Sequence, residues 1–247
     1  MNTLVISAQE LGDSLITLGE ASQERIRRQI SPLVIGAPLR LAVRNCCRVR
    51  AIVTQIEAGA ITLRITERLP PLARRPVYLV VAVPRPQTVK KVISLAVQAG
   101  IQQVFFVKSF HTVPSYLQSH SLLPDAIDAE IIKAMEQVWE SHPSHIDVLP
   151  SMQSFFEQKL SPLLEVKPNI TRVLAEPLSP QTTLIDTVLG TSKGDVLIAL
   201  GPEKGWSSRE MSVFESRGFT LAHIDDREYR VETALGLLLG KIVAVPN

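Results

Sequence analysis

The most constraining feature of this chain is a series of short apolar runs that begins at Val77 and alternates with helical segments. The first run, 77–83, reads VYLVVAV, which is typical of a strand buried on both faces of a parallel sheet. Further strand-like runs lie at 104–107, 146–149, 172–176, 196–200 and 219–224. Helical patterns occupy 87–100, 125–141 and 231–245. This order predicts an α/β fold with a mostly parallel sheet.

The residues before this alternation follow a different pattern. Segments 38–56 and 60–68 are rich in β-branched residues and partly alternate, with breaks at 44–45 and 58–59. A proline-punctuated linker follows at 69–76. We therefore expect a small, β-rich, barrel-like domain over 1–72 and an α/β domain over 73–247.

Charge is distributed unevenly between these two parts. Residues 1–76 hold eleven arginines, no lysine and six acidic residues, a net charge of +5, whereas the remainder carries −3. A basic domain of this kind suits a polyanion, and the guanidinium fork matches phosphate oxygens. A solvated arginine-rich surface explains the same charge equally well. The candidate contacts lie between apolar neighbours on the predicted strands: Arg40, Arg48, Arg50 and Arg64.

Several classes of protein do not fit this sequence. No apolar run is long enough to cross a bilayer, so no membrane association is expected. The N-terminus lacks the basic start of a signal peptide, and the only cysteines, Cys46 and Cys47, are adjacent. We therefore expect no disulfide, no metal site and a cytoplasmic location. Phosphate-loop, dinucleotide-binding and serine-hydrolase motifs are missing from the sequence.

The candidate site lies in three loops that follow predicted strands: 175–179, 201–207 and 225–234. Parallel sheets bind ligands beyond the carboxyl ends of their strands. Gly201 and Gly205 allow the backbone to approach a ligand closely, and Pro202 stiffens the turn. Ser207 and Glu210 match a capping box, which predicts that a helix begins there and stops near Gly218. A simple strand-to-helix connection remains an alternative for 201–207.

Two stretches, LIALGPEKGWSSREM (197–211) and REYRVETALGLLLG (227–240), carry a family resemblance. Together they resemble the C-terminal signature of the RsmE-type 16S rRNA uridine-N3 methyltransferases of the SPOUT superfamily. That signature has a Gly-Pro-Glu-Gly-Gly loop, a Ser-x-x-Glu helix start, a Gly-Phe pair and an Arg-x-Glu-Thr-Ala segment. The matching positions are Gly201, Pro202, Glu203, Gly205, Ser207, Glu210, Gly218, Phe219, Arg230, Glu232, Thr233 and Ala234.

The resemblance implies a specific architecture and activity. The α/β domain is expected to contain a deep C-terminal trefoil knot, to bind S-adenosylmethionine and to form a homodimer. The first domain is expected to be PUA-like and to bind RNA, namely 16S rRNA in the small ribosomal subunit, through the four arginines named above. The expected cofactor contacts are Glu176, Leu200, Gly201, Pro202, Glu203, Gly205, Ile224, Tyr229, Arg230, Thr233 and Ala234.

The resemblance also suggests catalytic roles. Arg230 is expected to stabilise the anion that forms when uracil N3 loses its proton, and Glu203 is the expected proton acceptor. Glu232 is a second candidate acceptor, although helix capping fits it better. The sequence departs from the family pattern at Lys204 and Trp206 in the first loop and at 224–226 before the second. A divergent paralogue acting on another RNA and a non-catalytic RNA-binding scaffold therefore remain alternatives.

Overall fold

The structure is a computed structural model that describes residues 3–30, 32–57, 59–190 and 194–244. The chain forms two compact units. The first comprises Met1–Arg74 together with Ile131–Pro143, and the second comprises Arg75–Glu130 together with Ser144–Asn247. These units differ from the expected domains mainly in segment 131–143, which joins the first unit. The division into domains at 1–72 and 73–247 remains a prediction.

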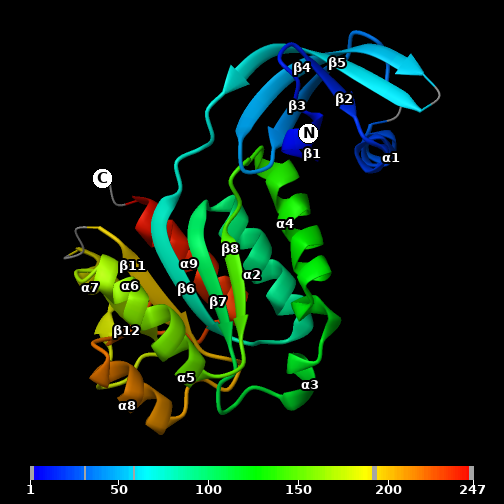
Figure 1. Ribbon diagram of the computed structural model, residues 1–247. Coiled ribbons are helices and arrows are strands. Elements are labelled where there is room, and N and C mark those ends of the chain that lie inside the picture. Colours follow the sequence, from blue (N-terminus) through cyan, green and yellow to red (C-terminus); the bar gives the residue numbers. More distant parts are fainter. Residues whose placement is uncertain (1–2, 31, 58, 191–193, 245–247) are drawn as a thin grey trace. The chain divides into compact units, whose positions relative to one another are not determined.

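The second unit is built on a parallel sheet, in agreement with the sequence (Figure 1). Among the described residues its strand order is β10-β12-β9-β11-β6-β7-β8, and every neighbouring pair is parallel. The strands are β6 (Arg75–Ala82), β7 (Ile101–Val107), β8 (His145–Leu149), β9 (Thr171–Ala175), β10 (Thr183–Leu184), β11 (Val196–Leu200) and β12 (Thr220–His223). All of β11 is buried, as is β6 from Val77 onward. The sequence analysis did not predict β10, which is only two residues long.

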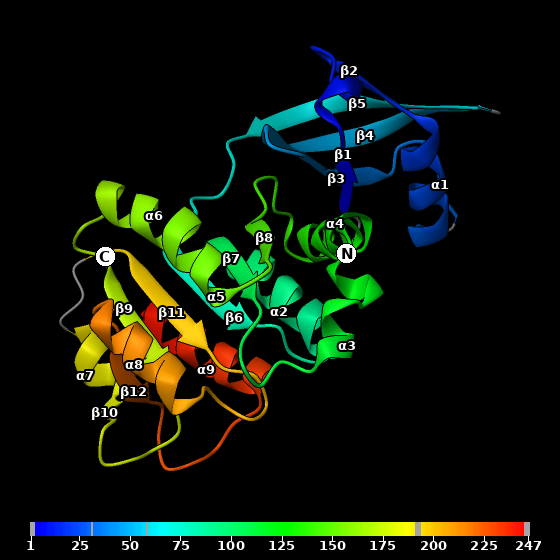
Figure 2. The ribbon, with the colours of Figure 1, turned by 60° about the horizontal axis from the view of Figure 1, so that its bottom comes forward.

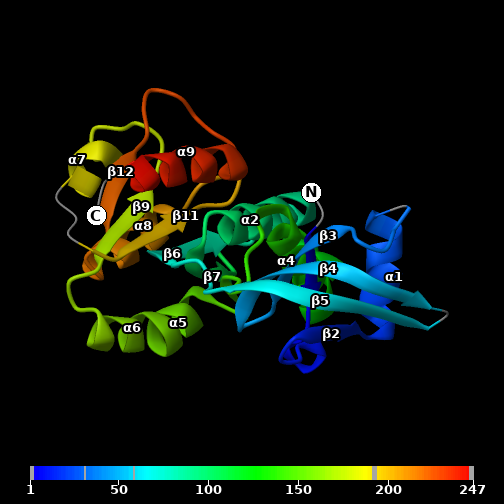
Figure 3. The same ribbon diagram turned by 90° about the horizontal axis from the view of Figure 1, so that it is seen from above.

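Helices cover both faces of this sheet (Figure 3). On one face lie α2 (Pro86–Gln98) and α9 (Val231–Ala244), and on the other lie α5 (Met152–Phe155), the π-helical turn η3 (Phe156–Leu160), α6 (Ser161–Val166) and α8 (Ser208–Ser216). The other helices are α3 (Pro114–Leu117), η2 (His120–Leu122), α4 (Pro124–Val138) and α7 (Ile185–Gly190). The helices predicted over 87–100, 125–141 and 231–245 are confirmed as α2, α4 and α9, although residue 245 lies outside the described residues. The helical stretch 152–166 was not predicted.

The predicted capping box at the start of α8 is confirmed. Glu210 N–H donates to Ser207 Oγ at 3.3 Å, and Ser207 N–H donates to the Glu210 carboxylate at 2.9 Å. Two backbone donors at the helix start are thereby satisfied. Gly218 follows the helix with φ of +76°, in the left-handed region that favours glycine.

The first unit contains a mostly antiparallel sheet with strand order β1-β3-β4-β5-β2. Its elements are β1 (Thr3–Ile6), η1 (Ala8–Glu10), β2 (Leu15–Leu18), α1 (Glu20–Gln29), β3 (Pro38–Val43), β4 (Cys47–Glu57) and β5 (Ala60–Leu69). The predicted break at 44–45 is a turn in which Asn45 has φ of +56°, and Gly59 at the next break has φ of +99°. Ala58 lies outside the described residues.

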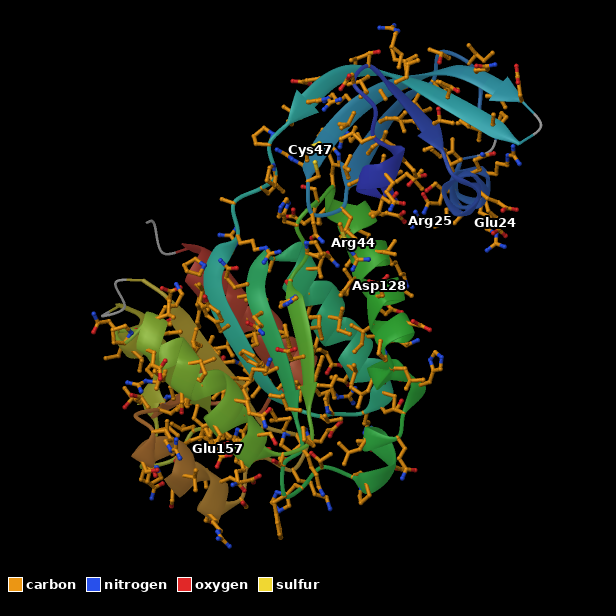
Figure 4. All side chains as sticks on the ribbon, in the orientation of Figure 1. Glu24, Arg25, Arg44, Cys47, Asp128 and Glu157 are labelled. Carbon is orange, nitrogen blue, oxygen red and sulfur yellow. The ribbon has the colours of Figure 1, made fainter. Side chains whose placement is uncertain are left out.

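The two cysteines form no disulfide with each other. Cys46 is exposed and Cys47, at the start of β4, is half-buried (Figure 4). No helix that the structure describes combines the length and the apolar character needed to cross a membrane.

Candidate functional site

Three loops of the second unit begin at one edge of the sheet because their strands are neighbours and parallel (Figure 2). β9 lies between β11 and β12, and Ala175 pairs with Leu200 on one side and with Ala222 on the other. The ladder continues one step further, since Glu176 N–H donates to Ala222 O at 2.9 Å. The loops after β9, β11 and β12 therefore start at the same level, as the parallel-sheet prediction requires.

These loops surround a cavity of about 320 Å³. Of the eleven residues predicted to contact a cofactor, ten line it, and Thr233 does not. The structure adds five lining residues that sequence reasoning missed. They are Ala175, Pro177, Arg227, Glu228 and Val231. All five are next to or within two residues of predicted ones, so a wider window around each motif position would have included them.

The loop after β11 turns back on itself, and both of its glycines are needed for this. Gly205 has φ of +70°, and its N–H donates to Pro202 O at 2.8 Å. A Cβ atom on Gly201 would lie 3.2 Å from Gly205 Cα, which is closer than ordinary packing allows. Lys204 is exposed at the tip of the turn, whereas Trp206 is buried, with its ring 4.9 Å from that of Phe214. The unusual tryptophan therefore anchors the loop in the hydrophobic core.

The turn is also fixed to a second loop, which follows β7. His111 Nδ1 lies 3.0 Å from Gly205 O, and Phe110 N–H donates to the Glu210 carboxylate at 2.7 Å. Phe110 itself is 78% exposed. The Gly205 side of the cavity wall is thus held both by its own turn and by the loop after β7.

Glu203 is paired with the segment that precedes α2. Its carboxylate accepts a hydrogen bond from Arg85 N–H at 3.0 Å, and Arg85 Nε lies 3.6 Å from the same oxygen. Glu203 therefore connects the loop after β11 to the loop after β6.

Arg230 lines the opposite wall of the cavity, immediately before α9 begins. The preceding turn is closed by Asp225, which accepts hydrogen bonds from Tyr229 Oη–H at 2.7 Å and from Arg227 N–H at 2.8 Å. The Tyr229 hydroxyl, followed by Arg227 N–H, lowers the pKa of Asp225 below its ordinary value. This closed turn brings Tyr229 and Arg230 to the cavity, and their contact with a cofactor stays a prediction.

Glu232 contacts α2 and does not line the cavity. Lys91 Nζ donates to its carboxylate at 2.9 Å, and this hydrogen bond, followed by the residue's own backbone N–H, lowers the pKa of Glu232. The predicted capping role therefore has support in that backbone contact, and the ion pair adds a bridge between α2 and α9.

Glu176 differs from these carboxylates. It is half-buried beside the cavity, and its carboxylate accepts a hydrogen bond from Trp206 N–H. Burial raises the pKa of Glu176 to about 7, although the Trp206 hydrogen bond acts in the opposite direction. At neutral pH this carboxyl group is close to half-ionised.

A cluster of arginines occupies one face of the sheet in the first unit. Arg40 and Arg50 are paired across β3 and β4, and Arg48 pairs with Ala42, two residues after Arg40 on β3. Their guanidinium carbons lie 5.2, 5.6 and 5.0 Å from the ring centre of Trp139, within cation–π range. Trp139 Nε1–H donates to Leu41 O at 2.9 Å. Three of the four predicted polyanion contacts are thus gathered around one aromatic ring.

Arg64 is exposed on β5, where it pairs with Ile52 of β4. It is not among the arginines stacked on Trp139. Sequence reasoning missed Trp139 because this residue lies in segment 131–143, about ninety residues after the arginines in the chain. Among the residues that the structure describes, no group of three or more His, Cys, Asp or Glu side chains is placed to hold a metal ion.

Comparison with known families gives a match over residues 71–243 to the RNA methyltransferase domain. The chain belongs to this family. The matched region contains the whole cavity and its three loops, and the RsmE-type resemblance seen in the sequence is confirmed.

Relatives and solved structures agree with this assignment. The ribosomal RNA small subunit methyltransferase E of Treponema pallidum (strain Nichols) is 28% identical over 166 residues, 64% of this chain and 58% of that protein. This chain therefore matches little more than half of its curated relative. A ribosomal RNA small subunit methyltransferase E from Neisseria gonorrhoeae, bound to S-adenosyl methionine, superimposes with a TM-score of 0.74 at 16% identity, covering 99% of this chain and 96% of its own.

A second solved structure has a similar fold. The methyltransferase Lpg2936 of Legionella pneumophila, in complex with the same cofactor, gives a TM-score of 0.75 at 16% identity, with 98% of this chain and 97% of its own covered. At these identities the two solved structures establish a shared α/β fold.

Proposed function

We propose that this protein is an S-adenosylmethionine-dependent RNA methyltransferase that methylates N3 of a uridine in the 16S rRNA of the small ribosomal subunit. The observation that carries the proposal is the cavity at the sheet edge, which ten of the eleven predicted cofactor residues line in a member of the RNA methyltransferase family. The names of the Treponema and Neisseria relatives support the choice of ribosomal RNA.

The residues of the cavity suit the proposed cofactor. Its volume of about 320 Å³ lies within the range of small-molecule sites, roughly 300 to 1,000 Å³. The half-buried carboxyl of Glu176 suits a cationic group, whereas Arg227 and Arg230 suit a carboxylate. The turn at Gly201 and Gly205 offers backbone groups without side chains between them and a ligand. When bound, S-adenosylmethionine supplies a methyl group that is already activated.

The chain must then prepare the nucleophile. Uracil N3 carries a proton, so N3 can form the new N–C bond only after that proton leaves. Arg230 is our candidate for stabilising the resulting anion, because its guanidinium remains charged and lies at the cavity wall. Glu203 is our candidate proton acceptor, and its bond with Arg85 orients it. The N3 proton passes to Glu203 first, and the N3 lone pair can then accept the methyl group, whose bonding electrons would remain with the donor.

Further parts of the proposal concern assembly and RNA binding. We infer a PUA-like domain over 1–72 that holds RNA phosphates through Arg40, Arg48, Arg50 and Arg64, and a methyltransferase domain over 73–247. A deep trefoil knot, a homodimer and a cytoplasmic location complete the proposal. The family resemblance supports these features, and the arginine cluster around Trp139 supports RNA binding.

The test is methyl transfer to small ribosomal subunits from cells that lack this protein, with methyl-labelled cofactor and mapping of the modified base. Wild-type protein is expected to place one label on a uridine N3. Arg230→Ala is expected to lower turnover by about 10²-fold or more, the loss typical of one removed anion-stabilising group. Arg209→Ala, on the exposed side of α8, removes the same charge outside the cavity and should retain activity.

Other outcomes would change the proposal. A label on another RNA, with none on small subunits, would support a divergent paralogue, for which the exposed Lys204 at the loop tip offers an altered substrate contact. Cofactor binding lost in a folded protein would support a non-catalytic RNA-binding scaffold. Full activity in Arg230→Ala would remove this residue from the mechanism.

A further inference from the structure

Glu176 is held rigidly at the cavity wall. Its N–H extends the ladder between β9 and β12 by bonding to Ala222 O, and its carboxylate accepts a hydrogen bond from Trp206 N–H in the adjacent loop. Trp206 is itself fixed in the core against Phe214. The position of this carboxyl group is therefore set by two strands and by a loop that a buried ring anchors.

The same carboxyl group has no cationic partner in the part of the chain that the structure describes. Glu203 is paired with Arg85, and Glu232 with Lys91, but no Lys, Arg or His forms an ion pair with Glu176. The other charged residues that line the cavity are Glu203, Arg227, Glu228 and Arg230. A half-buried carboxylate without a cation is disfavoured, because a single backbone hydrogen bond replaces only part of the hydration that burial removes.

We infer that Glu176 is the counter-ion for a cationic centre of the methyl donor, either its sulfonium or its α-ammonium group. The inference rests on the proposed function, and it deepens it by assigning a charge-recognition role to one cavity residue. A cation bound beside Glu176 would supply the missing partner. If that cation is the sulfonium, the carboxylate favours the donor over the product, because sulfur in S-adenosylhomocysteine is an uncharged thioether.

The inference predicts a pH dependence for binding. Only ionised Glu176 can act as a counter-ion, so protons compete with the ligand as the pH falls. With a pKa of about 7, the ionised fraction falls about eightfold between pH 7.5 and pH 6.0, and the apparent Kd rises by about the same factor. Binding is therefore tight above the pKa and weakens progressively below it.

The experiment is isothermal titration calorimetry on the full chain with S-adenosylmethionine and S-adenosylhomocysteine at pH 6.0 and pH 7.5. Three proteins are compared: wild type, Glu176→Gln and Glu165→Gln. Glutamine at 176 retains an oxygen that can accept the Trp206 hydrogen bond but has no charge. Glu165 is exposed on α6, so its variant removes one negative charge away from the cavity. Thermal unfolding of each protein checks that it is folded.

Wild type and Glu165→Gln are expected to lose about eightfold in donor affinity on going to pH 6.0, whereas Glu176→Gln binds weakly at both values. If Glu176→Gln weakens the binding of S-adenosylmethionine only, the bound cation is the sulfonium. If it weakens the binding of S-adenosylhomocysteine as well, the cation is the α-ammonium group. The same pH dependence in Glu176→Gln as in wild type would overturn the inference and leave the proposed function intact. Absence of donor binding by folded wild type at both pH values would refute the proposed function itself.

Discussion

Replacement of Gly205 by alanine tests whether the cavity wall needs a left-handed backbone. Gly205 has φ of +70°, and a Cβ atom there would meet only Glu176 Oε2, at 4.0 Å, an ordinary contact. The destabilisation expected in Gly205→Ala therefore comes from backbone strain and not from a steric clash. An L-residue in this region costs about 1–2 kcal/mol, and alanine recovers about 0.4–1 kcal/mol by restricting the unfolded chain. The net loss in free energy of unfolding should be about 1 kcal/mol.

The hydrogen bonds around Gly205 decide where this loss is observed. Its N–H donates to Pro202 O, its carbonyl contacts His111 Nδ1, and the next N–H, of Trp206, donates to Glu176. At about 1 kcal/mol each, these three bonds outweigh the strain, so the loop should keep its shape in Gly205→Ala. We therefore expect the loss in stability, with cofactor affinity changed by less than about threefold.

The assay combines thermal unfolding with calorimetric titration of S-adenosylmethionine. For a chain of this size 1 kcal/mol corresponds to a fall in Tm of about 2–4 °C. Gly36→Ala is the matched control, because Gly36 has φ of +89°, a Cβ atom there would have no neighbour within 4 Å, and the residue lies in the first unit. If Gly205→Ala keeps the wild-type Tm but binds S-adenosylmethionine clearly more weakly, the loop has relaxed. That result would contradict the claim that the three hydrogen bonds hold its shape. An unchanged Tm and Kd would refute the strain itself.

Three further predictions concern other parts of the molecule. Ser207→Ala should lower the free energy of unfolding by about 1 kcal/mol through loss of the N-cap of α8, measured by urea denaturation; no change would contradict the capping box. Trp139 has φ of +55°, so Trp139→Gly should be less destabilising than Trp139→Ala by about 1 kcal/mol, since both lose the ring contacts and only glycine avoids the strain. Equal losses in free energy of unfolding for the two variants would show that the positive φ of residue 139 has no energetic cost. A variant in which the three arginines around this ring are replaced by glutamine should bind RNA with a weaker salt dependence. The slope of log affinity against log salt concentration should fall by about two units, whereas Arg28→Gln, on exposed α1, should lower it by less than one. An unchanged slope in the triple variant would remove the cluster from the interface. The substituted arginines are Arg40, Arg48 and Arg50.

Local patterns predicted the strands and helices that carry the candidate site. The run 196–200 predicted a buried strand, and every residue of β11 is buried. Ser207 and Glu210 predicted the start of α8, because a capping box depends on residues three apart in the chain. The short strand β10 and the stretch 152–166 lacked such a signal. The two exposed residues of β10 are held by pairing with β12, and 152–166 packs against the hydrophobic core of the second unit.

Pairings between distant residues were not predictable in the same way. Nothing near Glu203 in the chain indicates Arg85, which is over a hundred residues earlier, and nothing near the basic strands indicates Trp139. Likewise, the sequence suggested Glu176 as a cofactor contact but gave no reason for its raised pKa. Burial beside Trp206 raises it, and burial is a property of the folded chain.

The sequence by itself therefore determined the parallel sheet, the three loops at its edge and the family, because each of these depends on residues close together in the chain. The tertiary structure decided which of the carboxyl groups near the cavity have cationic partners. Glu203 and Glu232 form ion pairs with basic residues distant in the chain, whereas Glu176 is half-buried and forms none with the residues that the structure describes. Charge compensation depends on distances through space, and only folding sets those distances.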